Sequence, residues 1–150
     1  MKKNCATILI ATIVLILDRI TKFIVQQTMS EGETIPIWQD IFSLSYIQNE
    51  GIAFGFLADY GQLLVVTTTL IIGIIVFLLF RLKSINYWTA GAFGLVLGGA
   101  MGNLWDRLSV GGVIDFIDIG YKDYRWPAFN LADASICIGV FMLLLTKKEK

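Results

Sequence analysis

Asp115 and Asp133 are acidic residues whose surroundings in the sequence favour a chemical role. Asp115 lies between apolar residues directly after two glycines, in GGVIDFIDIG, so a strand or turn should present it near a membrane surface. Asp133 follows Asn130 by three residues, at the head of the apolar segment 129–145. A lone carboxylate in hydrocarbon costs about 3 kcal/mol or more, so it is seldom found there without a partner or a function.

If Asp115 and Asp133 converge, mutual repulsion and partial desolvation keep one of them protonated at neutral pH. The ionised carboxylate can then take a proton from water while the protonated partner polarises a carbonyl group. This is the logic of an aspartic peptidase, and the titration belongs to the pair rather than to either residue. The sequence has no histidine, which excludes His-based triads and the usual zinc ligand sets. We therefore expect no metal and no cofactor.

Structural interpretations of the same residues stay open at this point. Asp133 could interact with a helix dipole, and Asp115 could form a salt bridge with Arg107 or Arg125. Asp118 competes with Asp115 as the carboxylate of the pair, because it lies three residues further along the same segment.

Asp18 and Lys22 are four residues apart in the first apolar segment, a spacing that predicts an ion pair within one helix. Interfacial and buried acids also form relays in proton- or ion-coupled transporters. Asp18 is isolated in an otherwise apolar run, so no relay across a bilayer is visible. A transporter, and a subunit that binds a partner through its outside segments, are the alternatives to an enzyme.

The composition is that of a membrane protein. The chain has 150 residues, of which 56% are hydrophobic and 16% charged, and its formal net charge of +0 gives no indication of nucleic-acid binding. About 20 apolar residues are needed to span a bilayer as a helix. Four segments approach that length: 4–25, 62–80, 87–105 and 131–145.

The positions of the basic residues predict an orientation. Seven of the 12 lie at the N-terminus, after the second apolar segment and at the C-terminus: Lys2, Lys3, Arg81, Lys83, Lys147, Lys148 and Lys150. By the positive-inside rule these regions are cytoplasmic, so both termini lie inside. The first outside connection has partial alternation over 34–56, which predicts short strands. The second outside connection, 106–128, is mixed in charge. Aromatic residues are expected near the outer interface: Trp38, Trp105, Tyr121, Tyr124 and Trp126.

The fold expected from these patterns is an all-α membrane protein with four transmembrane helices, a small extracytoplasmic β-sheet and a surface loop helix, forming one domain over 1–150. The third span carries small residues at every fourth position, which permits close approach of another helix: Ala90, Gly94, Gly98 and Gly102. Asn103, Asp106 and Arg107 then share a face at its outer end. Cys5 and Cys137 are interpreted as packed thiols.

Five motifs in this order resemble the lipoprotein signal peptidases, also called type II signal peptidases, of bacterial plasma membranes. They cover essentially the whole chain: DRITK at 18–22, NEGIAFG at 49–55, GGAMGNLWDR at 98–107, GVIDFID at 112–118 and FNLADA at 129–134. One departure is that family members more often have a serine directly after the second catalytic aspartate. This chain has Ala134 there, followed by Ser135.

The resemblance implies that Asp115 and Asp133 are the catalytic pair. It also implies that a further set of residues shapes or holds the site: Asn49, Gly99, Asn103, Arg107, Asn130 and Ala132. Asp18 and Lys22 would serve in stability or positioning.

The substrate implied by the resemblance is a prolipoprotein whose lipobox cysteine carries diacylglycerol, cut just before that cysteine. We expect its acyl chains to lie among membrane lipid, with the signal helix beside the glycine face and the NEGIAFG segment closing over the site. The protein would be a multi-pass monomer of the bacterial inner membrane, with its site near the outer face.

Overall fold

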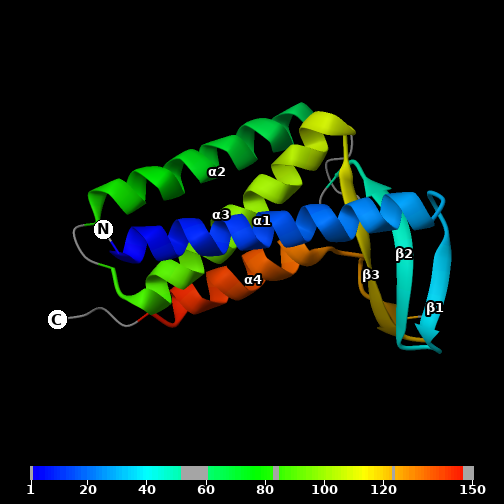
Figure 1. Ribbon diagram of the computed structural model, residues 1–150. Helices are drawn as coiled ribbons and strands as arrows, with labels where there is room; N and C mark the ends of the chain where they lie inside the picture. Colours follow the sequence, from blue (N-terminus) through cyan, green and yellow to red (C-terminus); the bar gives the residue numbers. More distant parts are fainter. Residues whose placement is uncertain (1, 52–60, 83–84, 123, 147–150) are drawn as a thin grey trace.

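The computed structural model describes residues 2–51, 61–82, 85–122 and 124–146. Four helices form a bundle, and a small sheet lies at one end of it (Figure 1). The helices are α1 (Lys2–Thr28), α2 (Gly61–Arg81), α3 (Tyr87–Ser109) and α4 (Leu131–Leu144). The four apolar segments of the sequence are therefore confirmed as helices. α1 and α3 also extend several residues beyond the apolar segments that predicted them.

By length and composition, α2 is the one helix in the described residues that meets the requirements for crossing a membrane, and α4 is a shorter apolar helix. Charged residues interrupt the other two helices near the sheet, with Asp18 and Lys22 in α1 and Asp106 and Arg107 in α3. The prediction of four transmembrane helices thus stays a prediction.

Small residues of α3 allow α1 to pack closely against it. A Cβ atom on Gly94 would lie 2.8 Å from Ile10, and one on Gly98 would lie 2.6 Å from the carbonyl oxygen of Ala11. This confirms that the small-residue face is a packing surface. α1 fills this face at Gly94 and Gly98, and the expectation that a substrate's signal helix lies beside the face stays a prediction.

The sheet is antiparallel, with its strands in the order β1-β2-β3-β4. The strands are β1 (Thr34–Trp38), β2 (Phe42–Asn49), β3 (Val113–Tyr121) and β4 (Tyr124–Arg125). Val25 in the last turns of α1 and Met29 just after it form a buried cluster with Ile114 and Phe116 of β3. This cluster holds β3 against the end of the helix bundle. The prediction of strands is confirmed over 34–49.

Some expectations fall outside the described residues or are corrected. No surface helix is found in the described parts of the connections, and residues 52–60, which include most of NEGIAFG, lie outside them. The tail lysines 147, 148 and 150 and Lys83 lie outside them too. Cys5 and Cys137 are exposed, so their interpretation as packed thiols is wrong. Apolar surroundings in the sequence cannot tell an outward helix face from an inward one.

The expected interfacial aromatic residues are all exposed. They lie on the strands, on the segment before α4 and near the end of α3: Trp38, Trp105, Tyr121, Tyr124 and Trp126. All of these positions belong to the end of the molecule that carries the sheet (Figure 1).

Candidate active site

Asp115 and Asp133 line the same cavity, of about 470 Å³. Asp115 is on β3, and Asp133 is in the first turn of α4. The cavity wall also includes the following residues from β2, α3, β3 and the segment before α4: Asn49, Arg107, Val113, Trp126 and Phe129. The fold therefore brings together two aspartates that are 18 positions apart in the sequence.

A short backbone pairing brings the start of α4 to β3. The N–H of Ile117 donates to the carbonyl oxygen of Phe129 at 2.8 Å, and the N–H of Phe129 donates back to Ile117 at 3.1 Å. Immediately after this bridge the chain turns into α4, with Asn130 as the N-cap. The prediction that Asn130 caps this helix is confirmed.

Asn130 and Asp133 form a capping box. The side-chain oxygen of Asn130 accepts from the Asp133 N–H at 2.9 Å, and Oδ2 of Asp133 accepts from the Asn130 N–H at 3.2 Å. Such reciprocal bonds satisfy donors that a helix start leaves free. Here they also fix the orientation of the Asp133 carboxyl group.

Asparagine amides hold the remaining carboxyl oxygens. Oδ1 of Asp115 accepts from Asn130 Nδ2 at 2.8 Å, and Oδ2 accepts from Asn49 Nδ2 at 2.9 Å. Oδ1 of Asp133 accepts from Asn103 Nδ2 at 2.7 Å. Each of the four oxygens therefore has one N–H donor, which positions both groups without cancelling their charge.

The environment of Asp115 favours its protonated form. Its residue exposure is 3%, and burial, together with the nearby charge of Asp133, raises its pKa to about 7. The hydrogen bonds from Asn49 and Asn130 and the positive charge of Lys22 oppose that rise. A carboxyl group with such a pKa holds its proton at slightly acidic pH, as a general acid must.

Arg107 lines the cavity without forming an ion pair to Asp115 in the described part of the chain. Its NH1 atom reaches only the carbonyl oxygen of Asn103, at 3.5 Å, and its buried Nε has no hydrogen-bond partner among the residues described. The guanidinium group is thus available as a donor near the two carboxyl groups. The alternative that Asp115 is salt-bridged to Arg107 or Arg125 is not supported.

Asp118 lies outside the cavity and pairs with Arg125. Its Oδ1 accepts from Arg125 Nε at 3.0 Å and pairs with NH2 at 2.9 Å, while Ser45 reaches Oδ2 at 3.3 Å. It does not line the cavity. Geometry therefore favours Asp115 over Asp118.

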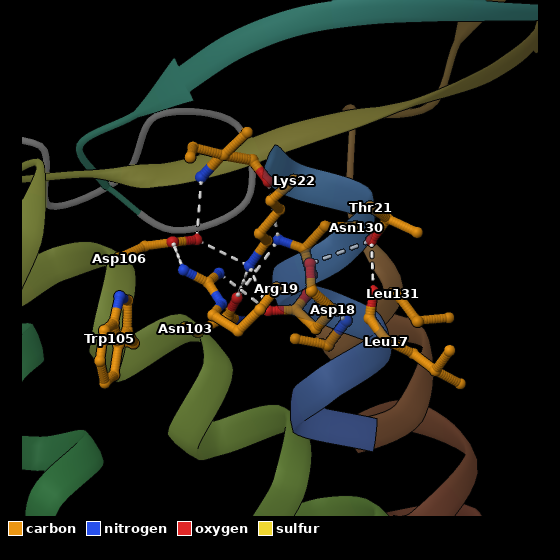
Figure 2. Close-up of polar contacts among 12 residues, drawn as sticks. Leu17, Asp18, Arg19, Thr21, Lys22, Asn103, Trp105, Asp106, Asn130 and Leu131 are labelled. Atoms are coloured by element: carbon orange, nitrogen blue, oxygen red, sulfur yellow. Dashed lines mark hydrogen bonds and ion pairs between the residues drawn. The ribbon is translucent and has the colours of Figure 1, made fainter. Parts of the chain in front are cut away.

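Figure 2 shows a cluster of four charged side chains, of which Asp18, Lys22 and Asp106 are buried and Arg19 is partly exposed. Lys22 pairs with Asp18 at 3.0 Å, which confirms the predicted i, i+4 pair, and with Asp106 at 2.7 Å. Arg19 pairs with the same two acids, at 2.9 and 2.6 Å. The contacts of Arg19 and Asp106 were not predicted from the sequence. They join α1 to α3 across more than 80 positions, and no short motif encodes such a pairing.

Hydrogen bonds join the charge cluster to residues next to Asp115 and Asp133 in the chain and to Asn103, which donates to Asp133. Oδ1 of Asp18 accepts from the backbone N–H of Ala132 at 3.2 Å, and Oδ2 of Asp106 accepts from the N–H of Ile114 at 3.3 Å. Lys22 donates to Oδ1 of Asn103 at 3.0 Å. Of the residues that the resemblance implicates, Asp18 and Lys22 are thus beside the pair rather than in the cavity.

Gly99 and Ala132 set the distance between α3 and α4. A Cβ atom on Gly99 would lie 2.8 Å from Ile136 and still closer to the carbonyl oxygen of Ala132. The hydroxyl of Ser135 donates to Leu131 at 2.8 Å within α4, so it does not replace the hydroxyl that Ala134 lacks.

Comparisons with known proteins agree with this picture over nearly the whole chain. A family model described as signal peptidase (SPase) II matches residues 10–147. A lipoprotein signal peptidase of Geobacter sulfurreducens is 41% identical, covering 86% of this chain and 82% of the relative. One from Syntrophus aciditrophicus is 42% identical, covering 100% and 97%. A bacterial membrane enzyme solved by the in meso method at 2.3 Å resolution is similar in structure, with a TM-score of 0.84, 32% identity and coverage of 96% and 93%.

Proposed function

Because the chain belongs to the signal peptidase II family, we propose that it is an aspartic endopeptidase whose catalytic pair is Asp115 and Asp133. The family's enzymes are lipoprotein signal peptidases of the bacterial inner membrane, proteases that cleave signal peptides from prolipoproteins. One observation supports the assignment of the pair: two carboxyl groups on separate elements face one cavity. Each of their four oxygens accepts a hydrogen bond from one N–H group.

In the proposed reaction Asp115 carries the proton and Asp133 is ionised. Asp133 accepts a proton from water as the water oxygen bonds to the scissile carbonyl carbon, and Asp115 donates a hydrogen bond to the carbonyl oxygen. When the C–N bond breaks, the proton on Asp133 moves to the leaving amine. Arg107 and Asn49, which line the cavity, are candidates to hold the substrate backbone because they supply fixed donors.

The proposed substrate is a diacylglyceryl-modified prolipoprotein, cut just before its lipidated cysteine. An apolar wall of Val113, Trp126 and Phe129 beside two carboxyl groups suits a peptide that carries acyl chains. Membrane lipid is the expected surrounding of those chains. No metal or nucleic acid is part of the reaction.

We further propose that all four helices cross the membrane, with both termini cytoplasmic and the sheet outside. The outward faces of the helices are apolar, as lipid contact requires: exposed examples are Ile8, Phe23, Phe77 and Phe141. The start of α1 and the end of α4 lie far from the sheet (Figure 1), which agrees with the basic residues at both ends of the chain. We also propose that the protein is a monomer, because residues of a single chain enclose the cavity that both carboxyl groups line.

The experiment is cleavage of a synthetic prolipoprotein by the purified protein in detergent, with and without the diacylglyceryl group, followed by mass spectrometry of both products. We expect a single cut directly before the lipidated cysteine and no cut in the unlipidated precursor. Equal cleavage of both precursors would contradict the substrate assignment. Failure of the folded protein to cut either one would contradict the function.

A further inference from the structure

Lys22 is fully buried, with a residue exposure of 0%, and it has no surplus donor. Its ammonium group contacts three acceptors: Asp18 at 3.0 Å, Asp106 at 2.7 Å and Oδ1 of Asn103 at 3.0 Å. A lysine ammonium has three N–H donors and no acceptor. All three donors are therefore used, two of them on the charge cluster and one on Asn103.

The contact with Lys22 determines which way the Asn103 amide points. Since an ammonium group can only donate, the amide atom facing it must be the oxygen, which places Nδ2 2.7 Å from Oδ1 of Asp133. A flipped amide would bring an N–H donor against the ammonium and an oxygen against a carboxylate. Asn130 Nδ2, which reaches Asn103 Oδ1 at 3.2 Å, favours the same orientation.

We propose that Lys22 is a positioning residue that acts through Asn103 on Asp133, and so makes Asp133 the member of the pair that is ionised. This inference rests on the proposed function and deepens it. An N–H donor stabilises the charged form of a carboxyl group, so locking the amide in its donating orientation favours negative charge on Asp133. Lys22 never needs to touch the substrate for this effect.

Arg19 provides an internal comparison. It pairs with the same Asp18 and Asp106 as Lys22 does, but no contact between Arg19 and Asn103 is found in the described residues. Removing either cation leaves the other one paired with both acids. The two residues therefore pair with the same two acids, but differ in burial, since the Arg19 side chain is 25% exposed and that of Lys22 is buried, and in the contact with Asn103.

Several charged groups face Asp133 from the elements around it. They are Asp115 on β3, Arg107 on α3, and Lys22 and Asp18 on α1. All of these except Lys22 are retained in the Lys22→Met variant. A change in the pH profile that is specific to this variant consequently reports the loss of the ammonium group.

The test compares Lys22→Met with Arg19→Met in the full-length protein. We would measure kcat/KM for the lipidated precursor between pH 5 and 9, together with the melting temperature of each variant. For Lys22→Met we expect the acidic limb of the profile to move up by about one pH unit, so that kcat falls by up to about tenfold at pH values below the limb, with little change in KM. Arg19→Met should also lower the melting temperature but leave the acidic limb in place.

A third variant tests the route through the amide. Asn103→Leu should move the acidic limb as Lys22→Met does, and adding Lys22→Met to it should cause no further shift. Asn103→Leu keeps all four side chains of the charge cluster, so it still tests the proposal if Lys22→Met does not fold.

Equal profiles for Lys22→Met and Arg19→Met would overturn the inference and leave Lys22 a stabilising residue. An additive shift in the double variant would overturn the route through Asn103. Failure of the proposed function is distinguishable, because in that case wild type itself does not cleave or Asp133→Asn retains turnover.

Discussion

Gly99→Ala should separate α4 from α3 next to Asp133. The added Cβ atom would lie 2.8 Å from Ile136 and closer still to the carbonyl oxygen of Ala132, whereas ordinary contacts begin near 3.4 Å. The backbone of α4 must therefore move by about 1 Å, and overpacking of this kind costs about 1–3 kcal/mol. The shift also lengthens the 2.7 Å bond from Asn103 to Asp133. A misplacement of about 1 Å in catalytic groups lowers the rate by about 100-fold.

The matched control is Gly73→Ala on α2, where a Cβ atom would meet nothing within 4 Å. Alanine in place of glycine inside a helix stabilises by about 0.5–1 kcal/mol, so this variant should melt slightly higher and cleave normally. Both would be assayed by cleavage of the lipidated precursor and by thermal unfolding in detergent. A Gly99→Ala variant with a rate within twofold of wild type would refute the close-contact reasoning.

Three further predictions concern the acidic residues. Asp115 must hold a proton in the proposed reaction, and its pKa is about 7, so the cleavage rate should fall as the pH rises above about 7. A pH-rate profile that still rises at pH 9 would contradict this prediction. The pKa of Asp115 in the folded protein lies above its value of about 4 in an unfolded chain, so the stability it contributes is present at low pH and lost as the pH rises. The melting temperature of wild type relative to Asp115→Asn should accordingly decline between about pH 4 and 7, and a constant difference would argue against the shift. Asp118→Asn should lose at most about 1 kcal/mol, since its pair with Arg125 is partly exposed, and it should cleave at close to the wild-type rate.

Local patterns predict the elements that carry the candidate site. The lengths of the apolar segments predicted the four helices. The three-residue spacing of Asn130 and Asp133 predicted the start of α4, because capping depends only on neighbouring residues. The apolar residues around Asp115 and the two glycines before them predicted a strand or a turn, and the structure has the strand β3 there. These features depend on contacts close in the sequence.

Contacts between distant elements could not be predicted in this way. The pairing of Arg19 with Asp106 depends on how α1 lies against α3, and a periodic face of small residues does not say which helix will fill it. Similarly, Cys137 has apolar neighbours on both sides, but only the arrangement of α4 puts it on the exposed side beside the cavity.

The most direct test of the central claim is the turnover of the lipidated precursor by purified Asp115→Asn and Asp133→Asn, with melting temperatures measured on the same samples. An asparagine keeps the size of the side chain but cannot exchange the proton that the reaction needs. We predict that both variants fold and that neither cleaves detectably. Substantial turnover by either folded variant would contradict the assignment of the pair.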